Sequence, residues 1–167
     1  ALSLTSHKPL KQIIYQREQY LCKLDSENDI SWNEFVDTSS SIDCVAVDSN
    51  DPLYILHTSG TTGIPKGIVR TNGGHAVALL NSMKMTYDIS EDDVFWAASD
   101  VGWVVGHSYI VYAPLLLGCS TVLYEGKPVG TPDAGQFWRV ISEHKVKTMF
   151  TAPTAIRAIK KEDADGK

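Results

Sequence analysis

A stretch rich in hydroxyls and glycines is the part of this chain best suited to chemistry. It runs from Thr58 to Gly67 and holds four small hydroxyls, three glycines and one lysine. Glycines let backbone N–H groups approach a ligand closely, and successive N–H groups form a concavity that binds anions. The hydroxyls add rotatable donors, and Lys66 adds a positive charge. This composition favours a polyphosphate ligand over a lone carboxylate.

Two common nucleotide-binding motifs do not fit the stretch. The P-loop needs a Gly-Lys pair followed by Ser or Thr, whereas Pro65 precedes Lys66 and Gly67 follows it. No hydroxyl follows the lysine to hold magnesium, which weakens a GTPase or kinase interpretation. The dinucleotide pattern G-x-G-x-x-G is also missing from this segment. An ordinary polar turn is the structural alternative, since Gly, Ser, Thr and Pro are common in loops.

Residues 55–66 resemble the AMP-binding signature of the acyl-adenylate-forming superfamily, which includes acyl-CoA synthetases, luciferases and peptide-synthetase adenylation domains. The resemblance implies that the loop binds the β- and γ-phosphates of ATP, with Mg²⁺ and oriented donors stabilising the departing pyrophosphate. It also implies two acyl transfers, first from a carboxylate to acyl-AMP and then to coenzyme A. The phosphate-binding residues that it implies are Thr58, Ser59, Gly60, Thr61, Thr62, Gly63 and Lys66.

A second resemblance concerns the acyl group. Residues 98–109 and 151–157 are similar to acetyl-CoA synthetases and their short-chain relatives, and residues 124–132 are similar to the mitochondrial branch that favours propionate. This resemblance implies an acyl-pocket wall made by Trp103, Val104 and Val105. A rigid indole is a physical stop for a growing alkyl chain, although the residue type alone favours a core tryptophan. Many bacterial acetyl-CoA synthetases carry threonine where this chain has Val105, which favours propionate over acetate.

Several parts of the family's machinery are not found in this chain. These are the segment for adenine and magnesium, the ribose-binding aspartate, the adenylation lysine and the residues that hold the CoA phosphates. We therefore assign no catalytic and no metal-binding residue, and we expect an internal piece of an adenylation domain. Residues 1–50 are the expected lead-in, and residues 51–167 the expected central AMP-binding part. The implied function is a short-chain acyl-CoA synthetase acting on propionate or acetate; the alternative is a non-catalytic nucleotide- or phosphate-binding scaffold.

Composition limits the partners and the compartment. The 167 residues carry a net charge of −5, which argues against a nucleic-acid or anionic-membrane surface. No apolar run approaches the ~20 residues of a membrane-spanning helix, and the first residues lack the regions of a signal peptide. A mitochondrial matrix location follows from the resemblance alone, with the cytoplasm as the alternative. The oligomeric state is not encoded, and three widely spaced cysteines indicate neither a disulfide framework nor a zinc site.

The elements that must position these residues alternate between strands and helices, which predicts an α/β fold. We expect part of a large N-terminal domain of an acyl-adenylate-forming enzyme, with a mostly parallel sheet and helices on both faces. Expected strands are 11–15, 53–57, 67–71, 94–98, 120–124 and 147–150. Expected helices are 31–36, 75–87, 106–117, 133–144 and 153–161. Pro114 lies inside one of these helices, where a proline breaks or kinks the backbone.

Three other polar residues admit two interpretations each. His107 suggests a general base, because histidine titrates near neutrality. A carboxylate nucleophile needs no such base, so a structural hydrogen bond is favoured for His107. Asp92 and Asp93 suggest a metal site, but capping of the preceding turn is favoured for them.

Overall fold

The computed structural model describes residues 11–17, 20–25, 27–59 and 63–166. The chain forms two compact units, residues 1–46 and residues 47–167. Each unit is described by itself below.

The first unit holds little structure. Strand β1 (Gln12–Ile14) pairs in parallel with β2 (Asp29–Ser31), and α1 (Trp32–Asp37) follows directly. Ser31 caps α1, since its hydroxyl accepts a hydrogen bond from the backbone N–H of Glu34 at 3.2 Å. The strand and the capped helix expected here are confirmed. None of the described residues of this unit is buried.

The second unit begins with the antiparallel hairpin of β3 (Pro52–Thr58) and β4 (Lys66–Thr71), which confirms strands on both sides of the hydroxyl-rich loop. Helix α2 (Asn72–Met85) follows, and it begins three residues before the predicted start. Two free N–H groups of its first turn find partners elsewhere in the chain. Asn72 donates to the Asp51 carbonyl at 3.0 Å and Gly73 to the Ser49 carbonyl at 2.8 Å. Glycine at position 73 permits this close approach, because a side chain there would collide with Ser49.

A parallel sheet with strand order β6-β5-β7 forms the middle of this unit. Its strands are β5 (Val94–Ala98), β6 (Ser120–Thr121) and β7 (Thr148–Thr151). The predicted strand 120–124 was too long. Only one further ladder bond, from Val122 N–H to the Phe95 carbonyl at 3.2 Å, extends the pairing beyond Thr121. The chain then turns away, and the Tyr124 hydroxyl donates to the Thr131 carbonyl instead.

One continuous helical segment contains Pro114 without breaking. It consists of α3 (Val104–Gly106), the wider π-helical turn η2 (His107–Tyr112) and α4 (Ala113–Leu117). At the end of η2 the Ala113 N–H donates to the Ser108 carbonyl, five residues back. The wider turn relieves the contact between the proline ring and the preceding turn and needs no N–H from Pro114. Gly118, with a φ of 83°, ends the segment in the left-handed region.

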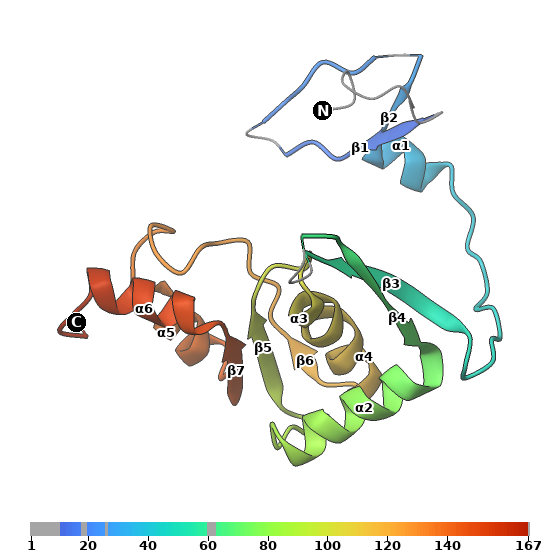
Figure 1. Ribbon diagram of the computed structural model, residues 1–167. Coiled ribbons are helices and arrows are strands. Elements are labelled where there is room, and N and C mark those ends of the chain that lie inside the picture. The colour runs from blue at the N-terminus through green and yellow to red at the C-terminus, as the bar shows by residue number, and fades with distance from the viewer. Residues whose placement is uncertain (1–10, 18–19, 26, 60–62, 167) are drawn as a thin grey trace. The chain divides into compact units, whose positions relative to one another are not determined.

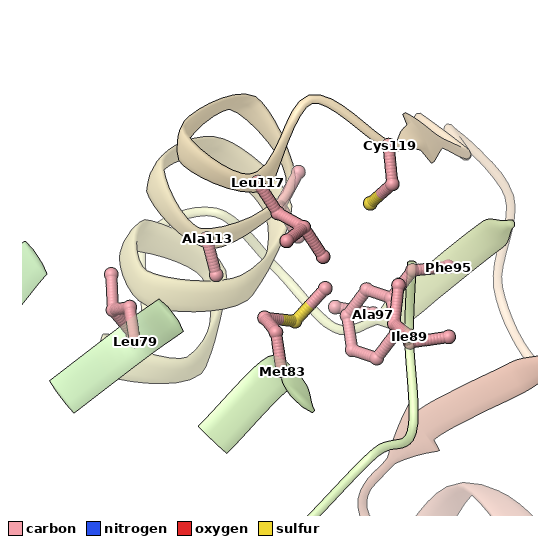
Figure 2. Packing of buried hydrophobic residues seen from close by; sticks show 9 residues of the cluster. Leu79, Met83, Ile89, Phe95, Ala97, Ala113, Leu117 and Cys119 are labelled. Atoms are coloured by element: carbon pink, nitrogen blue, oxygen red, sulfur yellow. The ribbon is translucent and has the colours of Figure 1, made fainter. Parts of the chain in front are cut away.

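Helices cover both faces of the sheet because residues of β5 alternate between two hydrophobic clusters. Phe95 and Ala97 pack in one cluster with residues of α2, η2 and α4, whereas Trp96 packs in the other with residues of α5 (Gln136–Glu143) and α6 (Pro153–Glu162). Figure 1 shows α5 and α6 on the other side of β5 from α3 and α4. In the first cluster, Met83 lies between Leu117 and Phe95 (Figure 2). The prediction of an α/β fold with a parallel sheet and helices on both faces is confirmed. Helix α5 is shorter than predicted.

Candidate functional site

The β3–β4 hairpin presents the predicted phosphate-binding residues at its tip. Thr58 and Lys66 face each other as the last pair of the ladder, so the hairpin brings the hydroxyl and the ammonium group to the same end. Ser59 and Gly63 are exposed, and Gly63 has a φ of 77°, a conformation that favours glycine. The other predicted residues of the loop, Gly60, Thr61 and Thr62, lie outside the described residues.

The charge on the hairpin suits an anion. Residues 52–71 contain Lys66, Arg70 and His57 but no aspartate or glutamate. Gly67 lets two neighbouring side chains pack closely, since a Cβ there would come within 3.2 Å of the His57 Nε2 atom and 3.0 Å of the Ile55 side chain. With cationic groups, hydroxyls and no carboxylate, this segment fits the phosphate groups of a nucleotide and offers no acidic ligand for a cation.

Trp103, Val104 and Val105 lie together at the start of α3. The Trp103 side chain is 70% exposed, Val104 is exposed and Val105 is half-buried. A tight turn holds their backbone, with the Trp103 N–H donating to the Asp100 carbonyl at 3.1 Å. The Trp103 indole is therefore not buried by the described residues, so it is not a core tryptophan there. Its backbone is held by the turn.

Gly106 lets that turn pack against the helix. Gly106 is buried, and a Cβ at this position would collide with the Asp100 carbonyl group and the Cα atom of Val101. Asp100 also accepts a hydrogen bond from the Gly102 N–H through its carboxylate at 2.7 Å. Any side chain at Gly106 would push the turn that carries Trp103 away from α3.

Four ring side chains connect the hairpin to the helices, a group that the sequence alone did not identify. Tyr54 of β3 stacks on Tyr112 at a centroid distance of 5.9 Å. It also meets the rings of His75 at 5.6 Å and His107 at 5.4 Å. No local pattern pairs Tyr54 with His75, because they are far apart in sequence. The sequence signal that could have identified Tyr54 is the alternation of side chains along β3, which puts Tyr54 on the same strand face as Thr58.

His75 is the buried polar member of this group. Its Nε2 atom lies 3.4 Å from the Tyr54 hydroxyl oxygen. Burial lowers the pKa of His75 below its usual value, and the positive charge of Arg70 lowers it further. Both effects favour the neutral form of His75, which lies beside a cavity of about 400 Å³. The cavity walls are mostly apolar and include Leu53, Ala76 and Leu116.

A comparison with protein families identifies the group to which these features belong. The family model described as AMP-binding enzyme matches residues 3–167. The chain belongs to the AMP-binding enzyme family. The signature resemblance of residues 55–66 is therefore confirmed at the level of the family.

Individual relatives of this AMP-binding chain include short-chain synthetases. The human "Acyl-CoA synthetase short-chain family member 3, mitochondrial" is 57% identical over 164 residues, 98% of this chain and 24% of the relative. The Dictyostelium discoideum "Acyl-CoA synthetase short-chain family member B, mitochondrial" is 48% identical over all of this chain and 25% of the relative. The "Acetyl-coenzyme A synthetase" of Methylobacillus flagellatus is 45% identical over 93% of this chain and 24% of the relative. The chain spans about a quarter of the length of these relatives.

Of the two aspartates considered for a metal site, Asp93 has the capping role in this AMP-binding chain. The Asp93 carboxylate accepts hydrogen bonds from the N–H and the hydroxyl of Ser90, both at 2.7 Å, which confirms capping of the turn. It also pairs with Lys147 at 2.9 Å. These contacts, the two from Ser90 first, lower the pKa of Asp93 to about 2. Within the described ranges, no three His, Cys, Asp or Glu side chains are grouped to hold a metal ion.

Two further features bear on partners of this family member. Among the described residues, no helix combines the length and the apolar character needed to cross a bilayer. The cysteines are free, with Cys22 and Cys44 exposed and Cys119 buried. Burial raises the pKa of the Cys119 thiol.

Proposed function

We propose that the protein containing this chain is an ATP-dependent short-chain acyl-CoA synthetase. The observation that carries the proposal is the hydroxyl-, glycine- and lysine-bearing hairpin tip in a chain of the AMP-binding enzyme family. The reaction is the attack of a short carboxylate on the α-phosphate of ATP, which gives acyl-AMP and pyrophosphate. The thiol of coenzyme A then displaces AMP. Relatives named as short-chain acyl-CoA and acetyl-coenzyme A synthetases support this class of reaction.

The hairpin tip is the proposed site for the β- and γ-phosphates. Lys66 supplies charge, Thr58 and Ser59 supply hydroxyl donors, and the loop glycines expose backbone N–H groups. Such donors stabilise the negative charge that develops on departing pyrophosphate, and each is worth ~3–4 kcal/mol in comparable sites. Mg²⁺ would neutralise part of the same charge. Residues 52–71 hold no carboxylate, so they would interact with Mg²⁺ only through hydroxyl groups or through the bound phosphates.

The proposed acyl-pocket wall is formed by Trp103, Val104 and Val105. An exposed indole on a fixed backbone is available to meet a ligand. One methylene changes binding by only ~1–3 kcal/mol in an apolar pocket, so a rigid wall is needed to exclude longer chains sharply. The apolar Val105 side chain favours propionate over acetate.

We propose that residues 51–167 form the central AMP-binding part and that residues 1–50 lead into it. By itself the chain would bind a nucleotide or polyphosphate without turnover. The mitochondrial names of several relatives support a location in the mitochondrial matrix, and a bacterial relative makes the cytoplasm the alternative.

The decisive experiment is propionate-dependent exchange between ATP and labelled pyrophosphate, measured on the complete protein that contains this chain. We expect exchange with propionate and, more weakly, with acetate. Release of ADP and a phosphorylated product in place of AMP and pyrophosphate would indicate a kinase. Absence of propionate- and acetate-dependent exchange in a folded protein would contradict the proposal.

A further inference from the structure

The Trp103 carbonyl oxygen is held by two groups of the same residue. His107 donates its backbone N–H to this oxygen at 3.0 Å, and the Nδ1 atom of its ring lies 3.2 Å from it. A carbonyl oxygen can only accept, so Nδ1 must carry the proton that makes the second bond. In the neutral ring the Nε2 atom is then without a proton. The ring of His107 thus fixes the backbone from which the Trp103 indole projects.

The His107 ring also contacts the strand that enters the phosphate loop. Tyr54 meets this ring at 5.4 Å with an interplanar angle of 38°. Tyr54 is itself held on two further sides, by stacking on Tyr112 and by an edge contact with His75. Along β3, Tyr54 shares a face with Thr58, which pairs with Lys66 at the hairpin tip. A displacement of the hairpin tip would therefore be transmitted to Tyr54 along β3.

We infer that His107 is a positioning residue that couples the phosphate loop to the acyl-pocket wall. Tyr54 sets the position of the His107 ring, and the ring sets the position of the Trp103 backbone. The inference rests on the proposed function, because it assigns the wall to Trp103 and ATP to the hairpin tip. Its consequence is that Tyr54 and His107 influence which acyl chain is accepted, although the proposed wall includes neither.

Two substitutions separate the hydrogen bond from the ring contact. In His107→Asn the side-chain amide N–H can replace the Nδ1 donor, whereas His107→Phe keeps a ring beside Tyr54 but donates nothing. The readout is the ratio of kcat/KM for propionate to kcat/KM for butyrate in the complete protein. We expect a ratio about tenfold lower in His107→Phe, and an intermediate ratio in His107→Asn, which keeps a donor for the Trp103 carbonyl but loses the ring that Tyr54 contacts. Trp103→Ala, which removes the wall itself, sets the upper limit of the change.

The strand side is tested with Tyr54. Tyr54→Phe keeps the ring and loses only the hydroxyl that faces His75, so the propionate-to-butyrate ratio of kcat/KM should stay unchanged. Tyr54→Leu should shift the ratio in the same direction as His107→Phe and also raise the KM for ATP. Leu115→Ala, an exposed position on α4, is the matched control and should change neither quantity. If the His107 and Tyr54 variants lose kcat/KM equally for propionate and butyrate, the ratio is unchanged. That result would indicate a packing role only and would overturn the inference.

A measurement on the unaltered protein covers the case in which a variant does not fold. Nitrogen-15 NMR of the His107 ring should show the tautomer with its proton on Nδ1. A neutral ring with its proton on Nε2 would overturn the inference. The proposed function fails in a different way, by loss of propionate- and acetate-dependent exchange in the unaltered protein. A changed acid preference in the Tyr54 or His107 variants alone is therefore distinguishable from a failure of the proposed function.

Discussion

Single residues of the hairpin decide which charge the proposed ATP site presents. Lys66 is the last residue of the ladder, opposite Thr58. If it stabilises the departing pyrophosphate, Lys66→Met should lower kcat/KM for ATP by about 100-fold, the effect of losing one such donor. Steady-state kinetics with propionate would measure it. Lys84→Met removes the same charge from the exposed end of α2 and should have little effect; equal losses in both variants would contradict a specific role of Lys66.

Another prediction at the scale of residues concerns Asp93, whose pKa is lowered to about 2. A carboxyl with a lowered pKa in the folded state stabilises the fold above its unfolded pKa of ~3.9. This stability is lost as the pH falls through about 2. We expect Asp93→Asn to unfold at lower urea concentration at pH 7 and to lose less of its remaining stability between pH 4 and pH 2. Urea midpoints across this pH range measure both effects.

The exposed neighbour of this residue supplies the control. Asp92→Asn removes the same formal charge one position earlier, so its acid dependence should match that of the unaltered protein. The same dependence in Asp93→Asn would show that the contacts with Ser90 and Lys147 do not govern acid stability.

At the scale of elements, helix α2 is anchored by the face that it turns toward the sheet. Met83 is fully buried in the first hydrophobic cluster, whereas Met85, two residues later on the same helix, is 79% exposed. Removing a buried methionine side chain costs about 2–5 kcal/mol, and surface substitutions stay within ~0.5 kcal/mol. We expect Met83→Ala to lower the free energy of unfolding by that larger amount and Met85→Ala to leave it nearly unchanged. Chemical denaturation measures both; similar losses would show that this face does not hold the helix.

At the scale of the whole molecule, the two units differ in how much they bury. No described residue of the first unit is buried, and the segment that follows α1 exposes Ile42 by 90% and Val45 by 78%. A unit of this size whose described residues form no buried core is marginally stable. Thermolysin should therefore cut the 167-residue chain first within residues 38–47 and leave a resistant product from about residue 47 onward.

The exposed Leu123 offers an internal comparison for this digestion. It lies just before a segment that is held by a hydrogen bond from the Tyr124 hydroxyl to the Thr131 carbonyl at 3.0 Å. We expect cleavage there to be slower. Mass spectrometry of the first products identifies the site, and a first cut within residues 122–135 would contradict the assignment.

Local patterns predicted most of the elements but not all of their ends. The apolar run of β5 and the Ser31 cap act over a few residues, so both were readable in the sequence. The first turn of α2 was missed because carbonyl groups of Asp51 and Ser49 satisfy its N–H groups. The predicted strand 120–124 was too long because an apolar run cannot show how far its neighbour in the sheet extends.

The sequence by itself determined the family, because the run from residue 55 to residue 66 carries its chemistry in consecutive residues. It also determined the α/β class, since strand and helix periodicities are local properties. Only the tertiary structure brought Tyr54, His107 and Trp103 into one chain of contacts. Packing between β3 and the helices decides that arrangement, and no spacing in the sequence encodes it. The hairpin charge was thus readable from the sequence, whereas the contacts proposed to couple ATP to acyl choice were not.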